Sequence, residues 1–355
     1  MATATVTGPL VSVLVPAHDA QSTLSESLRS ALAGTYPNIE LLVVDDGSRD
    51  STARIAEDFA AADNRIQVHR QSQQGVSAAL NLALRHARGD YVARLDSDDL
   101  WHPTKLERQM QIAARDPEAA LIHAFVRYID GQGRIVRDVA PQHFPRRALS
   151  RCLYDGIIGG NSSVLFRRSA IERAGGFDEQ LASWEDLLFQ LAVLADNPAA
   201  VVPEYLVGYR VRPDSLSADP QNMLDSWRVA RRRIDERFPQ IPKFVRDWAH
   251  GRRLVQLAES FAWKGRYATC TRLLAEGAAF DPRYARAFLG YRMARKLGPR
   301  RDETGGDAPH FLECDPEETY RFSAFDCGLE GAGLNRLEEG RRRLLEQIDG
   351  ELIAR

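Results

Sequence analysis

Short apolar runs alternate with amphipathic stretches over the first hundred residues. Each apolar run is rich in β-branched residues, as in strands buried in a parallel sheet, and each amphipathic stretch has helical spacing. The strands are expected at residues 11–15, 39–44, 66–69 and 91–95, and the helices at residues 22–34, 51–62 and 76–87. This alternation predicts an α/β fold with a doubly wound sheet flanked by helices, in which ligands bind at the carboxyl ends of the strands.

The pattern changes twice further along the chain. A mixture of strands and helices continues to about residue 220, and only helices are expected from there to about residue 296. Residues 299–317 are polar and contain Pro and Gly, which predicts a linker, and helical spacing returns at residues 334–353. The predicted domains are therefore a catalytic-type domain at 1–220, a helical region at 221–298, and a linker with a terminal helix at 299–355.

An acidic cluster follows the fourth predicted strand. It consists of Asp96, Ser97, Asp98 and Asp99. Three carboxylates in four positions repel one another, and a cation among them would relieve that repulsion. Oxygen ligands suit Mg²⁺ or Mn²⁺, and Mg²⁺ takes one or two protein carboxylates with water and substrate phosphates. One hypothesis is therefore a site for a metal-bound diphosphate; the other is an Asp-rich turn that caps a helix near Pro103.

Two other predicted strands also end in polar residues. They are followed by Pro16 to Asp19 and by Asp45 to Ser48. Because parallel strands present their carboxyl ends at one edge, all three endings are expected to open onto one crevice. Neither G-x-G-x-x-G nor G-x-x-x-x-G-K-[ST] occurs, so a metal rather than a glycine-rich loop would hold the phosphates.

Composition narrows the class of protein. The 355 residues are 44% hydrophobic and 27% charged, which is ordinary for a globular protein with more than one structural unit. The net charge of -2 gives no global case for a nucleic-acid partner. No apolar run approaches the roughly 20 residues that span a bilayer, and the N-terminus lacks a signal-peptide pattern. The four scattered cysteines lack zinc-site spacing, and a cytoplasmic location is expected.

Six segments together resemble family-2 glycosyltransferases, which are inverting enzymes with the glycosyltransferase A-type fold. The segments lie between about residues 10 and 220 and read VSVLVPAHDA, ELLVVDDGSRDST, QGVSAALNLALRHARGDYVARLDSDDLWHP, GGNSSVLFRRSAIERAGGFDE, WEDLLF and YRVRPDSLS. The resemblance implies transfer of a sugar from a nucleoside-diphosphate donor, a UDP-sugar, to a hydroxyl of a saccharide or lipid-linked acceptor. It also implies Mg²⁺ or Mn²⁺ and a place in surface polysaccharide or glycoconjugate synthesis.

The resemblance implies donor-side roles for residues at the strand ends. Asp45 and Asp46 match the position of a carboxylate that accepts a hydrogen bond from the base, and Asp98 matches a metal ligand. The other residues implied to contact the nucleotide or line its crevice are Pro16, Ala17, His18, Gly75, Asn81, Asp96 and Ser97. A plain turn before a helix is the alternative for Asp45 and Asp46.

The catalytic base implied by the resemblance is Asp186, which would take the proton from the acceptor hydroxyl. Glu185 is its rival, and a simple helix cap is the alternative role for Asp186. Trp184 either stacks on the acceptor sugar or packs in the protein. Asn161, beside two glycines, is a candidate contact of the donor sugar.

One position departs from the family's pattern. Where members often carry a histidine after the last strand, this chain has Arg212, which cannot bind a cation but can hold a phosphate. Arg210 and Arg212 are therefore candidate phosphate contacts, or they pair with nearby acids.

The predicted C-terminal helices are rich in arginine and aromatic residues. Basic residues from Arg228 to Arg253 could touch an anionic membrane, which would make the protein peripheral at its inner face, or a polyprenyl-diphosphate acceptor. Alternatively, they form a solvated helical face packed on the transferase domain.

Two alternative functions share the nucleotide half. A sugar-phosphate nucleotidyltransferase would need a basic glycine-rich loop after the first strand, which Pro16 to Asp19 is not. A non-catalytic sugar-nucleotide-binding module would keep its function after Asp186→Asn.

Overall fold

The computed structural model describes residues 8–139, 145–156, 159–212, 218–297, 310–316 and 332–352. The chain forms two compact units, and each contains segments that are far apart in sequence. The sheet unit comprises Met1–Arg146, Ile158–Pro213 and Asp307–Phe322, and the helical unit comprises Arg147–Ile157, Asp214–Gly306 and Ser323–Arg355. The domain boundaries near residues 220 and 298 stay a prediction.

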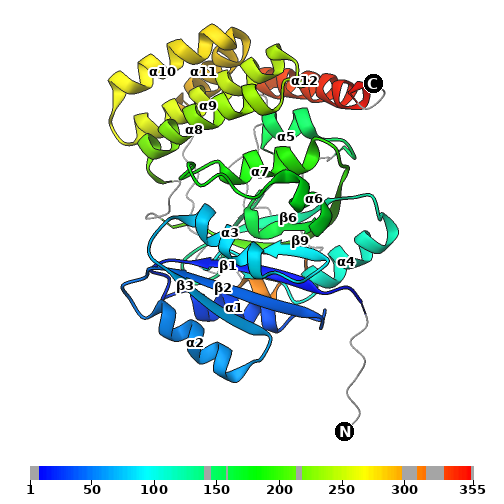
Figure 1. Ribbon diagram of the computed structural model, residues 1–355. Coiled ribbons are helices and arrows are strands. Elements are labelled where there is room, and N and C mark those ends of the chain that lie inside the picture. The colour runs from blue at the N-terminus through cyan, green and yellow to red at the C-terminus, as the bar shows by residue number, and fades with distance from the viewer. Residues whose placement is uncertain are drawn as a thin grey trace. The chain divides into compact units, whose positions relative to one another are not determined.

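The sheet unit is built on a mixed sheet in the order β3-β2-β1-β4-β8-β6-β9-β5, with β7 paired to β6 (Figure 1). Its first four strands are parallel, as predicted, and β8 runs antiparallel to both β4 and β6. The strands are β1 (Val11–Ala17), β2 (Ile39–Asp46), β3 (Ile66–Gln71), β4 (Tyr91–Arg94), β5 (Leu100–Trp101), β6 (Leu121–Ile129), β7 (Ile135–Asp138), β8 (Val164–Arg167) and β9 (Ala199–Arg210).

Helices cover this sheet between the strands. They are α1 (Leu24–Leu32), α2 (Thr52–Ala62), α3 (Val76–His86), α4 (Lys105–Arg115), α6 (Arg168–Ala174) and α7 (Glu185–Leu194). A 3₁₀ turn, η1 (Asn161–Ser163), directly precedes β8. The predicted fold class, a mixed sheet flanked by helices, is confirmed.

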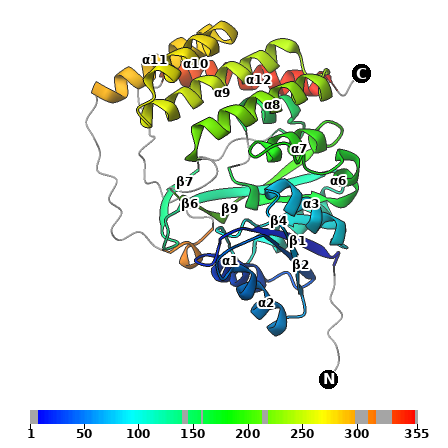
Figure 2. The same cartoon turned by 60° about the vertical axis from the view of Figure 1, so that its left-hand side comes forward.

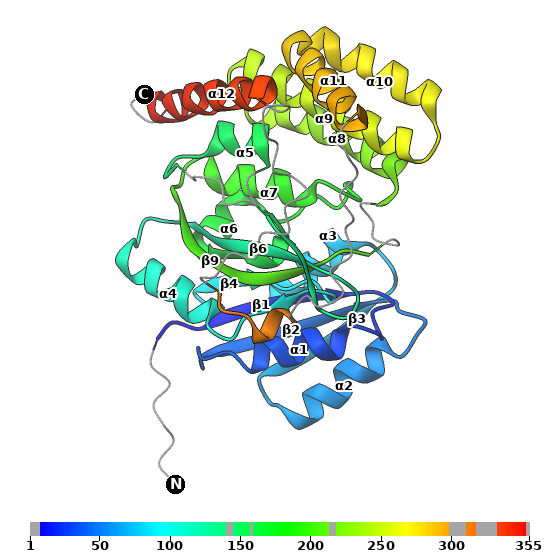
Figure 3. The same ribbon diagram turned by 180° about the vertical axis from the view of Figure 1, so that it is seen from behind.

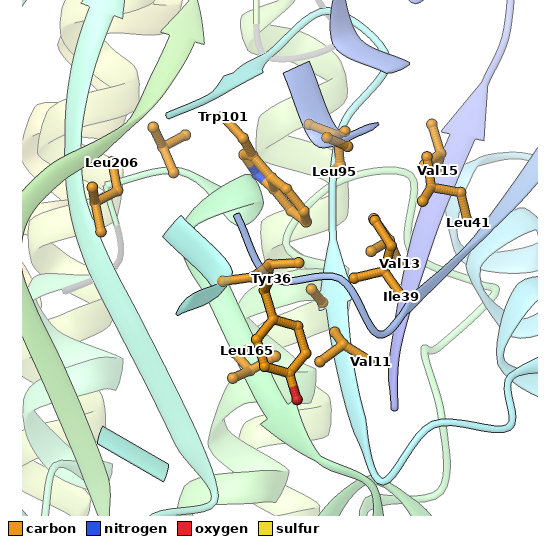
Figure 4. Close-up of a cluster of buried hydrophobic side chains, with 14 of the residues drawn as sticks. Val11, Val13, Val15, Tyr36, Ile39, Leu41, Leu95, Trp101, Leu165 and Leu206 are labelled. Atoms are coloured by element: carbon orange, nitrogen blue, oxygen red, sulfur yellow. The ribbon is translucent and has the colours of Figure 1, made fainter. Parts of the chain in front are cut away.

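The core explains why the first strands are apolar throughout. Every residue of β1 and β2 is buried, because helices cover both faces of a sheet of this type. Figure 4 shows Val11, Val13 and Val15 of β1 in a cluster that also contains Leu95 and Trp101. The Trp101 indole N–H donates to the carbonyl of Ser162 at 2.8 Å, so this large ring buries its one polar group with a partner.

Residues 310–316 belong to the sheet unit, although sequence analysis placed them in a linker. They include the 3₁₀ turn η3 (Phe311–Glu313), coloured orange beside α1 in Figures 2 and 3. Phe311 is fully buried in a small cluster with Leu100, Ile129 and Ile135. The rest of the predicted linker lies outside the described residues.

The helical unit consists of short and long helices packed on one another. They are α5 (Leu149–Asp155), α8 (Pro220–Arg237), α9 (Lys243–Trp263), α10 (Tyr267–Phe280), α11 (Pro282–Leu297) and α12 (Ala332–Glu351). Helices α9 and α10 approach each other closely at Gly251 and Gly277. The approach is so close that a Cβ atom on Gly251 would lie 2.9 Å from the Gly277 carbonyl oxygen.

Charged side chains join the helices of this unit in its interior. The Arg341 guanidinium donates to both carboxylate oxygens of Asp281 and to the Tyr154 hydroxyl, and it lies 4.2 Å from the Trp248 ring centre. Asp349 of α12 accepts the backbone N–H of Ser150 at 2.8 Å and so satisfies a donor at the start of α5.

Candidate active site

The carboxyl ends of β1, β2 and β4 meet at one edge of the sheet, as predicted. Residue His18 follows β1, and its Nδ1 lies 2.8 Å from the carbonyl oxygen of Asp46 at the end of β2. The side chain of His18 is exposed at this edge, whereas Pro16 and Ala17, which precede it, are buried in β1. The first two polar strand endings are therefore in direct contact.

Asp46 organises the loop that follows β3. Its Oδ1 accepts the backbone N–H of Gln74, and its Oδ2 accepts that of Gly75, each at 2.8 Å. Gly75 has φ of +95°, a conformation that glycine adopts without strain, and it precedes α3 directly. Asp45 is also buried and accepts the N–H of Ser48 at 3.3 Å. Both acids hold turns at this edge, and their contact with a base stays a prediction.

Asn81 joins α3 to the loop after α6. Its amide exchanges two hydrogen bonds of 2.9 Å with the backbone of Phe177 and donates to Glu179 at 2.8 Å. It also lines a cavity of about 380 Å³ together with residues of α3, β4 and α6, and none of the acidic cluster is among the lining residues. The structure thus assigns Asn81 to loop packing, and its place beside a nucleotide stays a prediction.

Ser162 and Asp99 fix the shape of the acidic loop. The hydroxyl of Ser162 donates to Asp99 Oδ2 at 2.6 Å and accepts the backbone N–H of Asp96 at 3.0 Å. Asp99 is fully buried and also accepts the N–H of Arg210 at 2.9 Å. Burial, and then the charges of Asp98 and Asp96, raise the pKa of the Asp99 carboxyl well above its ordinary value. Asp99 is therefore a structural acid, with Asp96 and Asp98 left to face the site.

Asp96 and Asp98 carry negative charge that the protein balances only in part. Their side chains are 21% and 28% exposed. Burial, and then the charge of Asp96, raise the pKa of Asp98 to about 6, against the opposing effect of Arg212. Arg212 Nη1 lies 3.9 Å from Asp98 Oδ2. A partly desolvated carboxylate beside a second one fits a divalent cation, which favours the metal hypothesis over a simple helix cap.

This donor set is small. Among the described residues no group of three or more His, Cys, Asp or Glu side chains is placed to enclose a metal ion. Mg²⁺ commonly binds through one or two carboxylates and completes its coordination with water and substrate phosphates. Asp98, with Asp96 beside it, suits that mode of binding.

Arg94 connects the acidic loop to the start of α7. Its Nε donates to Asp96 Oδ1 at 2.7 Å, and its Nη1 donates to Glu185 Oε1 at 3.2 Å. Arg94 is buried; burial alone would lower its pKa, but the charges of Asp96, Glu185 and Asp186 raise it. The predicted metal side and the predicted base side thus share one buried cation, which sequence analysis missed because Arg94 lies inside a strand-like run.

Glu185 and Asp186 have different surroundings. Glu185 is buried against Arg94, and burial followed by the charge of Asp186 raises its pKa to about 7. Asp186 is partly exposed, and its Oδ1 accepts the N–H of Leu187 at 2.8 Å. Asp186 is therefore the more accessible of the two candidate bases.

Trp184 precedes both acids in an unusual backbone conformation. Its φ of +68° lies in the left-handed region, which is rare for a bulky residue and costs on the order of 1–3 kcal/mol. Such strain persists where the surrounding structure demands it, often at functional sites. The conformation turns the chain into α7 so that Glu185 and Asp186 begin the helix.

Arg210 holds the acidic loop in place. Its Nε donates to the carbonyl of Asp98, and its Nη2 donates to Glu26 Oε2, each at 2.7 Å. Its Nη1 donates to the carbonyls of Asp130 and Gly131. Arg210 is buried by these contacts, so the structure favours Arg212, which is partly exposed, for the predicted phosphate contact.

A histidine from the distant 310–316 segment reaches the same network. His310 Nε2 lies 3.3 Å from Oε1 of Glu26, which pairs with Arg210 through its other oxygen. The contacts run from His310 through Glu26 and Arg210 to the Asp98 carbonyl. Sequence analysis gave no signal for this link, because residue 310 stands in a polar, linker-like stretch.

The last two predicted residues lie on connecting turns. Asn161 begins η1, where its Oδ1 lies 3.5 Å from Gln190 Nε2 of α7. Ser97 is partly exposed between Asp96 and Asp98. Residues 213–217 of the YRVRPDSLS segment lie outside the described residues.

A parallel sheet edge with paired acids, and a second acid pair at a helix start, stand in a mixed sheet of the glycosyltransferase A-type fold. Residues 12–175 match the family model "Glycosyl transferase family 2". The chain is 31% identical over 214 residues to the Escherichia coli UDP-Glc:alpha-D-GlcNAc-diphosphoundecaprenol beta-1,3-glucosyltransferase WfgD, and the match covers 59% of this chain and 80% of that protein. The chain belongs to glycosyltransferase family 2 and is a glycosyltransferase.

Other relatives share shorter regions or only the fold. The Bacillus subtilis putative glycosyltransferase EpsH is 33% identical over 167 residues, 46% of this chain and 48% of that protein, so the chain spans about half the length of this relative. A mannosyltransferase from Pyrobaculum calidifontis, solved with GDP-Man and Mn²⁺, aligns with a TM-score of 0.57, 23% identity, and coverage of 82% of this chain and 81% of that one. Staphylococcus aureus TarS 1-349, solved with UDP-GlcNAc, aligns with a TM-score of 0.56, 19% identity, and coverage of 80% and 85%.

Proposed function

We propose that this glycosyltransferase transfers a sugar, with inversion, from a nucleoside-diphosphate donor to a hydroxyl of the acceptor. The arrangement of Arg94 carries the proposal. By pairing with Asp96 and with Glu185, Arg94 ties the acidic loop to the start of α7 and leaves Asp186 accessible. An inverting displacement needs a leaving-group site and a base on opposite sides of the reacting carbon, and these two elements supply them.

The proposed step is a single displacement. The acceptor oxygen forms a bond to the anomeric carbon as the bond from that carbon to the diphosphate oxygen breaks. Asp186 takes the proton of the acceptor hydroxyl, and the nucleoside diphosphate leaves with the bonding electrons. The strained turn at Trp184 fixes where Asp186 begins α7, and Arg94 holds Glu185 beside it.

The donor side is proposed to use Mg²⁺ or Mn²⁺. Asp98 would hold the ion with Asp96 beside it, and the ion would neutralise the charge of the departing diphosphate. Arg212 is close enough to Asp98 to approach the same phosphates. His18, Asp45 and Asp46 would bound the nucleotide crevice. The solved structural neighbours contain GDP-Man with Mn²⁺ in one case and UDP-GlcNAc in another, which supports this class of donor.

The donor is proposed to be a UDP-sugar, and the acceptor a saccharide or a lipid-linked saccharide. The Escherichia coli relative is named for UDP-Glc and for an acceptor linked to diphosphoundecaprenol. Such an acceptor would place the protein in surface polysaccharide or glycoconjugate synthesis. No described helix is long and apolar enough to cross a bilayer.

The deciding experiment combines a donor screen with one substitution. The wild-type protein, incubated with a panel of nucleotide sugars, should release free nucleotide only when Mn²⁺ or Mg²⁺ is present. Asp186→Asn should abolish transfer while calorimetry shows unchanged donor binding. Metal-independent release, or equal transfer rates in the variant and wild type, would contradict the proposal.

A further inference from the structure

The two most exposed large hydrophobic side chains among the described residues flank the turn between α9 and α10. Trp263 ends α9 and is 75% exposed, and Tyr267 begins α10 and is 69% exposed. Gly265, with φ of +72°, lets the chain reverse between them. The turn lies at one end of the helical unit (Figure 1). Two large exposed rings on either side of one turn indicate a contact surface rather than a packing role.

Basic residues stand close to these rings in the sequence. Residues 264–275 contain three cations and no acidic residue, and all three cations are exposed. The turn patch is defined as Trp263, Lys264, Arg266, Tyr267 and Arg272. Two acids stand near its borders: Glu259 lies 3.5 Å from the Trp263 indole nitrogen, and Glu276 lies 3.9 Å from Arg228. The patch therefore combines amphipathic rings with net positive charge.

Several arginines of α8 and α9, in contrast, are paired with acids. From the sequence, a membrane contact and a solvated helical face were both open for these residues. Arg231 pairs with Asp235 and Asp247, and Arg252 pairs with Glu338. Paired charges give little net attraction to an anionic surface. These paired arginines are therefore poor candidates for a membrane contact.

We propose that the turn patch binds the surface of an anionic phospholipid bilayer. Trp and Tyr favour the headgroup level, where the ring is buried and the polar atom stays hydrated. Lysine and arginine are attracted to anionic headgroups. A second copy of the chain is a poorer occupant, because two such patches would bring six cations together. The inference is independent of the proposed transfer chemistry, since it concerns residues outside the sheet unit.

The test is sedimentation of the full chain with vesicles. Wild type should bind vesicles of phosphatidylethanolamine and phosphatidylglycerol, and bind phosphatidylcholine vesicles weakly. The double variant Trp263→Ala/Tyr267→Ala should bind the anionic vesicles about tenfold more weakly, because the interfacial rings are lost. Phe244→Ala, which removes a 43% exposed ring elsewhere on α9, is the matched control and should bind as wild type.

A second pair of variants tests the charge. Lys264→Glu/Arg266→Glu should abolish binding to anionic vesicles, whereas Arg232→Glu, at an exposed position of α8, should leave most of it. Circular dichroism would confirm that each variant is folded.

Three outcomes would overturn the proposal. The first is no binding of wild type to anionic vesicles, and the second is binding that the turn-patch variants do not weaken. The third is a dimer in light scattering that only the Trp263→Ala/Tyr267→Ala variant loses, which would make the patch an interface between copies. Metal-dependent cleavage of the donor should persist in that variant, so a failure here is separable from a failure of the proposed function.

Discussion

Buried charge is balanced differently at two places in this protein, one in each unit. In the helical unit, Arg341 is buried against Asp281, so each charge has a partner. In the sheet unit, Asp96, Asp98 and Asp99 crowd one loop, and the pKa of Asp98 is raised to about 6 by burial and by Asp96. The first arrangement holds helices together, whereas the second leaves negative charge that a bound cation would balance.

The largest expected effect of a single substitution is on the proposed base. Asp186→Asn should lower the turnover rate by about 10²–10⁴-fold, because the amide cannot accept the acceptor proton. Donor affinity and the melting temperature should change little. Initial rates, together with calorimetry of donor binding, would measure this split; a parallel loss of donor affinity would instead indicate a misplaced loop.

The next largest effect is expected on stability, from the buried pair of Arg341 and Asp281 in the helical unit. Arg341→Met should reduce the free energy of unfolding by about 3–5 kcal/mol, because Asp281 would stay buried without its cation. Denaturant titration would measure the loss. Arg343→Met is the matched control: its side chain is exposed and pairs only loosely with Glu339, so a change within about 1 kcal/mol is expected.

Removing a charge from the acidic loop should increase stability, whereas removing the charge of Arg341 decreases it. The pKa of Asp98 is raised in the folded protein, so the folded state binds the proton more tightly than the unfolded state does. This contribution to stability is present at low pH and is lost as the pH rises from about 4 to about 6. Asp98→Asn should therefore raise the melting temperature at pH 7, while it removes metal binding.

A pH titration of metal binding extends this prediction. Mn²⁺ affinity of the wild type should fall as the pH drops through about 6, because protonated Asp98 cannot bind the ion. Calorimetry between pH 5 and pH 8 would measure it. A lower melting temperature for Asp98→Asn, or a pH-independent affinity, would refute the contrast between the two units.

The smallest effect is expected from the hydrogen bonds by which Glu26 and Arg210 hold the acidic loop. Glu26→Gln would replace a charged partner of Arg210 by a neutral one, and Arg210 holds the Asp98 carbonyl. We expect the KM for the donor to rise about tenfold, since a hydrogen bond to a charged group contributes about 1.5 kcal/mol. Steady-state kinetics would show an unchanged kcat; Glu107→Gln, at a partly exposed position of α4, serves as the control.

Elements that follow from local pattern were predicted well, and those that depend on distant partners were not. The alternating apolar runs gave β1 to β4 and their helices within a few residues. The two-residue strand β5 and the short helix α5 were missed, because so few residues carry no periodicity. The three polar strand endings were correctly expected at one edge.

The site was predictable as a set of acids and not as a set of contacts. Asp98 and Asp186 stand out by their motifs, and their roles stay predictions. Ser162, Arg94 and Glu26 act through partners 66, 91 and 184 positions away in the chain, which no local pattern encodes. Arg210 looked like a phosphate contact because its type and place fit one, yet burial commits it to backbone carbonyls.

Phe311 limits how this chain can be shortened or joined to part of another transferase. The ring fills the space beside Leu100, next to the acidic loop, although about a hundred positions separate it from the final strand. A shortened version ending after β9 would leave that hydrophobic corner open to water. A hybrid that borrows the tail of another transferase would need to bring residues equivalent to 310–316 with its sheet.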